Sequence, residues 1–199
     1  MNTVKQYISG LKKAYYDHGA ENEWNHFESI IEGVSEGDLS ELKTLYPDIP
    51  VELMELLKFV DGTYWREYKG EEITFYLLGS DLEAYPYYLL SAKQMIEDKE
   101  EVFDTYADYV NREFDEVPID EQIIDDASKL CWLHFSDCMN NGGTSQLFID
   151  FSPSKKGTYG QIIRYVHDPD EIEVIANSFE EYLQMLMKDN FDFICEDSL

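Results

Sequence analysis

The chain has 199 residues, which suits one large domain or one domain with a small extension. Its 15 basic and 42 acidic side chains give a formal net charge of −27, which disfavours binding to nucleic acids or to anionic membrane surfaces, because both attract clustered Lys and Arg. The hydrophobic fraction of 44% supports a folded core, and no apolar run approaches the ~20 residues that span a bilayer.

The N-terminal part of the chain is predicted to be helical. Apolar residues at helical spacing predict one helix over 3–17, and the same period continues over 24–34. The sequence Ser35-x-x-Asp38 resembles a capping box, with Asp in place of the usual Glu or Gln. It predicts a short helix that stops before Pro47.

A further helix is predicted between Pro50 and Gly62, because Pro is tolerated in a first helical turn and Gly favours the C-terminal cap. After this helix the period changes, and "EITFYLLG" (72–79) predicts a buried strand. The segment "YPYYLL" (85–90) is β-prone but contains Pro86, which predicts a loop or an edge strand.

A second capping box, Ser91-x-x-Gln94, precedes another helical pattern. Apolar residues at helical spacing predict helix over 92–112, in one or two pieces. The next segment, 114–126, is acidic and contains Pro118, so we expect an exposed connection there.

Four β-prone segments follow, at 131–135, 146–151, 160–166 and 172–176. Short turn-rich connections between them are typical of neighbouring antiparallel strands. Ser178 then caps a last amphipathic helix. We therefore expect an α+β fold with N-terminal helices, a largely antiparallel multi-stranded sheet and a C-terminal helix packed on that sheet.

The segment from 134 to 151 carries the densest polar chemistry. Gly142-Gly143 lacks the spacing and the lysine of a phosphate-binding loop, so a hairpin turn through Asn141 is the better interpretation. Cys138 with His134 could form a nucleophile and its base, although one such pair in a hairpin is common by chance. The same two residues with Asp137 lack a fourth zinc ligand. We expect no metal and no cofactor.

Two groups of residues could contact a partner. Asp150 lies at a strand end before a turn, where it either caps the turn through backbone N–H groups or presents a carboxylate to a ligand. The residue types of Tyr64-Trp65-Arg66 are typical interface anchors, with core packing of Trp65 as the alternative. The candidate partner-binding residues are Tyr64, Trp65, Arg66, Asp137, Asn140, Asn141 and Asp150.

The cysteines and the N-terminus bear on location. Cys131, Cys138 and Cys195 are odd in number and form no CxxC motif, which favours free thiols in a reducing cytosol. The N-terminal segment lacks the apolar region of a signal peptide. We expect a cytoplasmic protein.

Three stretches together, 33–62, 81–95 and 131–186, resemble the SUKH superfamily, which includes fungal cell-wall-assembly regulators and many bacterial immunity proteins. The order and spacing of the motifs carry the resemblance more than any single motif. The matching residues are Pro50, Leu53, Leu57, Asp61, Gly62, Trp132, Asp150, Pro153, Gly157, Gly160, Gln161, Ser178 and Phe179.

The resemblance implies a SUKH-like protein-binding domain over 31–188 without an enzymatic role, between a helical extension (1–30) and an acidic tail (189–199). It implies an immunity protein that neutralises a toxin, and a nuclease toxin would be basic, which suits the charge of −27. A regulatory scaffold in cell-wall or signalling physiology is the alternative. An enzyme that uses Asp150, His134 or Cys138 is the third hypothesis. The oligomeric state is not predicted.

Overall fold

A computed structural model describes the chain except residues 1, 141–142 and 196–198, and it describes the backbone alone at 139–140 and 143–144. The elements in chain order are α1 (Thr3–Asp17), α2 (Glu21–Ile30), α3 (Glu36–Leu45), α4 (Val51–Phe59), β1 (Arg66–Tyr68), β2 (Glu71–Ile73), β3 (Tyr88–Leu89), α5 (Ala92–Glu97), α6 (Lys99–Val110), the 3-10 helix η1 (Ala127–Lys129), β4 (Trp132–Asn140), β5 (Gly143–Asp150), β6 (Gln161–Val166), β7 (Glu171–Ala176) and α7 (Phe179–Lys188).

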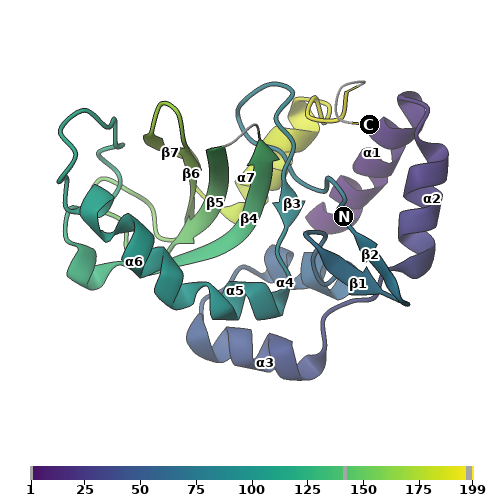
Figure 1. Cartoon of the computed structure of the whole chain (residues 1–199), viewed down its shortest axis with the longest axis horizontal. Coiled ribbons are helices and arrows are strands. Elements are labelled where there is room, and N and C mark those ends of the chain that lie inside the picture. Colours follow the sequence, from purple (N-terminus) through teal and green to yellow (C-terminus); the bar gives the residue numbers. More distant parts are fainter. Residues whose placement is uncertain (1, 141–142, 196–198) are drawn as a thin grey trace.

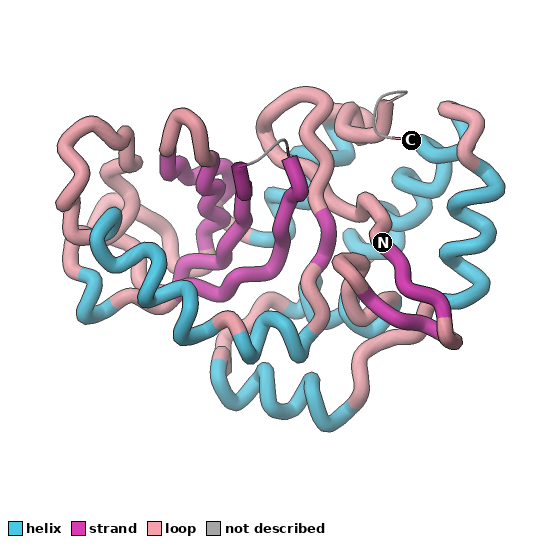
Figure 2. The backbone as a smooth tube through the Cα atoms, viewed as in Figure 1, coloured by secondary structure: helices cyan, strands magenta, loops and turns pink. Residues whose placement is uncertain are grey.

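The described strands β3 to β7 form one sheet in which spatial order follows chain order and every neighbouring pair is antiparallel. Strands β1 and β2 form a separate hairpin. Figure 2 shows this sheet surrounded by helices and long loops. The expected α+β fold with an antiparallel sheet is confirmed, and "YPYYLL" supplies the short edge strand β3.

Both faces of the sheet are buried, and α5–α6 and α7 lie on opposite sides of it (Figure 1). One face packs against α7 and the N-terminal helices in the larger core, which includes Leu133, Phe135 and Leu147. The other face packs against α6 and η1 in a smaller core, which includes Trp132 and Phe148. Side chains alternate between the two faces along each strand, so each strand contributes to both cores.

The predicted helix starts are confirmed at three serines. The side chains of Ser35, Ser91 and Ser178 each accept a hydrogen bond from the backbone N–H three residues later. At Ser91 the side chain of Gln94 also accepts from the backbone N–H of Ser91, which completes the capping box. The helix predicted over 92–112 is present in two pieces, α5 and α6.

The strand predicted over 72–79 is wrong beyond Ile73. The apolar residues that follow pack in the larger core, and an isolated bridge between Leu78 and Tyr87 takes the place of a regular ladder. The ring of Phe75 stacks on Phe27 with centroids 3.8 Å apart and on Tyr15 at 4.7 Å. A short run of buried apolar residues does not by itself specify a strand.

Helices α1 and α2 and the residues directly after α7 pack into the larger core. Tyr7 of α1 and Trp24 of α2 are fully buried, and so is Phe193 after α7. The ring of Phe191 lies 5.3 Å from that of Tyr7. The absence of a side chain at Gly79 is required here, because an added Cβ would stand 2.3 Å from the Phe193 ring. The division at residues 31 and 188 stays a prediction.

In the part of the chain that the structure describes, none of the helices combines the length and the apolar character needed to cross a bilayer.

Truncating Phe193 tests whether the C-terminal residues belong to the core. We expect Phe193→Ala to lower the free energy of unfolding by about 3–5 kcal/mol, because it removes a fully buried ring. Leu199→Ala, at a position 48% exposed, is the matched control and should change it by less than about 0.5 kcal/mol. Urea unfolding followed by circular dichroism measures both, and equal effects would contradict the packing.

Candidate functional site

A β-bulge in β4 decides which side chains share a face. His134 pairs with Phe148 of β5, and Ser136 pairs with Leu147, so Phe135 is an extra residue on β4. Because the alternation of faces shifts by one residue at this point, Asp137 lies on the same face as His134. Cys138 points to the opposite face, into the larger core.

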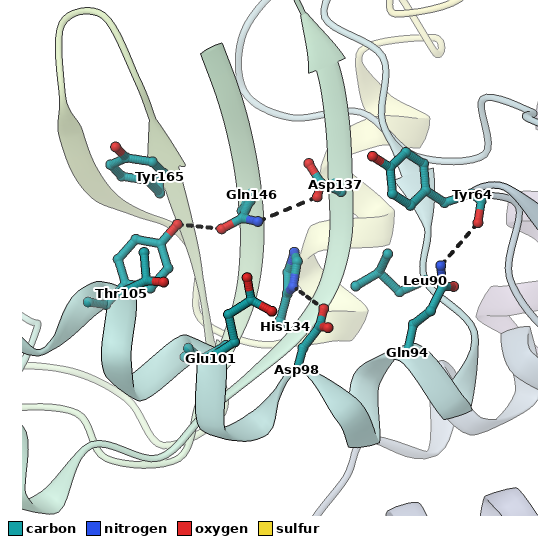
Figure 3. Close-up of a pocket in the computed structure, with 12 residues that line it drawn as sticks. Tyr64, Leu90, Gln94, Asp98, Glu101, Thr105, His134, Asp137, Gln146 and Tyr165 are labelled. Atoms are coloured by element: carbon teal, nitrogen blue, oxygen red, sulfur yellow. Dashed lines mark hydrogen bonds and ion pairs between the residues drawn. The ribbon is translucent and has the colours of Figure 1, made fainter. Parts of the chain in front are cut away.

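A pocket of about 430 Å³ lies between the α5–α6 arm and this face of the sheet (Figure 3). The arm supplies polar side chains from successive turns, and strands β4, β5 and β6 supply the opposite wall. The lining residues among those described are Tyr64, Leu90, Gln94, Asp98, Glu101, Val102, Thr105, Tyr106, His134, Asp137, Gln146 and Tyr165.

The His134 ring joins the sheet to the α5–α6 junction. Its Nδ1 lies 2.9 Å from Oδ2 of Asp98, and its Nε2 lies 3.0 Å from the backbone oxygen of Ser136. These two contacts fix the His134 ring between β4 and the junction of α5 and α6.

A second network runs along the floor of the pocket. The Tyr106 hydroxyl donates to Oε1 of Gln146. The Nε2 of Gln146 donates to Oδ2 of Asp137 at 3.4 Å (Figure 3). The backbone N–H of Cys138 donates to Oδ1 of Asp137 at 2.7 Å. Burial is the main cause that raises the pKa of the Asp137 carboxyl above its ordinary value.

The structure brings two of the predicted site residues to the wall of this pocket. Tyr64 and Asp137 line it. Trp65 adjoins Tyr64, with ring centroids 6.5 Å apart, and is 52% exposed, so core packing of Trp65 is not observed. Arg66 turns away to a bond of 2.8 Å between its Nη2 and Oδ2 of Asp61. Asn140 is the last residue of β4, and the structure describes only its backbone.

Asp150 lies apart from the pocket and has no exposed surface. Its carboxylate accepts hydrogen bonds from the backbone N–H of Ser152 at 2.7 Å and from Nε2 of Gln161 at 2.9 Å. The turn-capping interpretation is therefore confirmed. Burial raises the pKa of Asp150 to about 6, and the bonds from Ser152 and Gln161 oppose that rise.

The structure does not bring Cys138 and His134 together, because the bulge separates them onto opposite faces. Burial raises the pKa of the Cys138 thiol to about 12, so the thiolate that a nucleophile needs is disfavoured. Among the described residues, no three His, Cys, Asp or Glu side chains are grouped to hold a metal ion.

The hairpin turn predicted at Asn141-Gly142-Gly143 is described only at its flanks. Asn140 pairs with Gly143 in the antiparallel ladder of β4 and β5. Asn141 and Gly142 lie outside the described residues, and with them the predicted partner contact of Asn141.

Sequence reasoning missed the helical wall of the pocket. Asp98, Glu101 and Thr105 follow one another at intervals of three and four residues, which places them on one helix face. The helix was recognised from its apolar residues alone. The spacing of Asp98, Glu101 and Thr105 is the sequence signal that indicates a polar face on this helix.

A family model described as the SMI1 / KNR4 family (SUKH-1) matches residues 33–185. No curated protein matches the chain.

The buried carboxyl of Asp150 makes stability depend on pH. Its pKa of about 6 in the folded chain exceeds the ordinary value of 3.8, so the folded state binds the proton more tightly than the unfolded state. Stability from this group is therefore present at low pH and is lost as pH rises through the folded pKa.

We expect the stability of the wild type, relative to Asp150→Asn, to fall by about 2–3 kcal/mol as pH is raised from about 4 to about 7. Urea unfolding of both proteins across this range measures the difference. A difference that stays constant with pH would contradict the raised pKa.

The opposite placement of Cys138 gives a second test. We expect iodoacetamide at neutral pH to spare Cys138 in the folded chain and to modify it after unfolding in urea, because the side chain is 3% exposed and its pKa is about 12. Mass spectrometry of the peptides locates the label. Labelling of Cys138 in the folded chain as fast as in urea would revive the nucleophile hypothesis.

Proposed function

Because the chain belongs to the SMI1/KNR4 (SUKH-1) family, we propose that it is a non-enzymatic protein-binding domain, an immunity protein that neutralises a basic toxin by direct binding. The match covers residues 33–185, which is most of the chain. The immunity role is the one that the resemblance to the SUKH superfamily implies for bacterial members.

Charge is the observation that carries the proposal. With 42 acidic and 15 basic residues, the chain has a formal net charge of −27. Such a field attracts a basic protein over distances longer than a contact and speeds association by roughly 10- to 1000-fold at low salt. A toxin that cleaves nucleic acid must itself be basic where it holds phosphates. An acidic protein that covers this surface would inhibit it with no bond made or broken.

The local chemistry of Cys138 and Asp150 supports a non-enzymatic role. Cys138 is buried as a thiol in the core, and Asp150 is bound into a turn with no exposed surface. The candidate residues for catalysis therefore do not converge on one reaction centre. The exposed and half-buried groups around the pocket, Trp65 and Tyr64 among them, are of the type that anchors protein interfaces.

Co-expression with the protein encoded by the adjacent reading frame tests the proposal. We expect the chain to restore growth of cells that express this neighbour and to form a stoichiometric complex with it on size-exclusion chromatography. The association rate constant should fall as sodium chloride is raised, while the dissociation rate constant changes less.

Absence of both rescue and complex would contradict the immunity role. If the chain instead co-purifies with proteins of cell-wall synthesis or signalling, the regulatory scaffold becomes the better account. A complex that forms equally fast at low and at high salt would remove the charge argument while leaving the binding role.

A further inference from the structure

The pocket holds more negative charge than its own residues balance. None of the twelve described residues that line it is Lys or Arg, and three of them are the carboxylates of Asp98, Glu101 and Asp137. Asp98 is engaged by the His134 ring at 2.9 Å. Glu101 and Asp137 have no ion pair with any described residue. Figure 3 shows the Glu101 side chain extending from α6 into the pocket.

The cost of this arrangement is visible at Asp137. Its side chain is half-buried, and burial raises the pKa of its carboxyl. Its carboxylate accepts a hydrogen bond of 2.7 Å from the backbone N–H of Cys138 and a longer one of 3.4 Å from the amide of Gln146, and nearby His134 opposes the rise in pKa. A partly buried carboxylate without an ion-pair partner is unfavourable, and a cation brought in from outside would offset that penalty.

The remaining walls suit a planar cation. The rings of Tyr64, Tyr106 and Tyr165 line the pocket together with the carboxylates. A guanidinium group pairs with carboxylates through its fork of N–H donors and also stacks on aromatic rings, whereas an ammonium group is compact and more strongly hydrated. Carboxylates and tyrosine rings in one cavity therefore favour arginine over lysine.

The rim of the pocket offers an anchor for the rest of a partner protein. Trp65 follows Tyr64 directly and is 52% exposed. Its backbone has a φ of 49°, a left-handed conformation that is rare for a large aromatic residue. A large, half-exposed aromatic ring thus lies next to Tyr64 of the pocket wall, where a bound protein would cover it.

We propose that this pocket receives the side chain of one arginine from a basic protein partner, with Glu101 and Asp137 as the pairing carboxylates and Trp65 as the neighbouring contact. The inference rests on the proposed protein-binding function and names the surface that performs it. The pocket volume of about 430 Å³ leaves room for one such side chain and for water around it.

Nuclear magnetic resonance of the full chain tests the proposal with a small probe. We expect N-acetyl-arginine amide, at millimolar concentration, to shift backbone signals of the pocket residues, with the largest changes around Glu101 and Asp137. N-acetyl-citrulline amide has nearly the same shape without the charge and should cause no such shifts. N-acetyl-lysine amide should bind more weakly than the arginine compound.

Two variants on one helix make a matched pair. Glu101→Gln should weaken binding of the arginine compound about three- to tenfold, while Glu100→Gln, the same change of charge one residue away and outside this pocket, should leave it unchanged. Asp137→Asn is the second pocket variant and should also weaken binding. Equal effects of the Glu101 and Glu100 variants, or equal shifts from citrulline and arginine, would overturn the proposal.

The arginine-binding test can fail or succeed independently of the immunity role. If the arginine compound fails to bind but the toxin complex forms, the partner uses another surface and the proposal for this pocket is overturned. If the arginine compound binds as expected but no toxin complex forms, the pocket is upheld and the immunity role fails. Where both hold, Glu101→Gln should weaken the protein complex more than Glu100→Gln does.

Discussion

The bulge at Phe135 is the constraint on which the site depends. A regular strand would place His134, Ser136 and Cys138 on one face. The extra residue instead sends Asp137 to the pocket and Cys138 into the larger core. A shift of one residue therefore separates His134 from Cys138 and adds the carboxylate of Asp137 to the pocket. Bulges are often found where a strand must redirect a side chain toward a site.

The bulge has this effect because helices cover both faces of the sheet. The N-terminal helices and α7 cover one face, and α6 with η1 covers the other. Since α5 and α6 are separate helices that meet at Asp98, the arm can follow the sheet and still leave a cavity beneath it. The contact of Asp98 with His134 fixes the arm to β4 at that junction. The pocket is thus built from packing that the fold requires in any case.

Much of the fold was predictable because its signals are local. Serine caps and helical spacing predict α1, α3, α5 and α7, and alternating β-prone segments predict β4 to β7. The strand predicted from the apolar run over 72–79 is wrong beyond Ile73, since Phe75 packs against the ring of Phe27 on α2 and not in a strand ladder. The bulge, and hence the place of Asp137 in the pocket, could not be predicted. The bulge arises from the register between β4 and β5, which the residues of one strand do not specify.

The site was predictable in part for the same reason. Tyr64 and Asp137 are predicted partner-binding residues, and both line the pocket. Glu101 also lines it but is not predicted, because the apolar spacing of its helix says nothing about the polar face. Hydrogen–deuterium exchange of the chain with the protein encoded beside it tests the central claim, that the acidic pocket face binds a basic partner. The account predicts slowed exchange in α6 and in the loop of Tyr64 and Trp65. Protection confined to α1 and α4, with these segments unchanged, would contradict it.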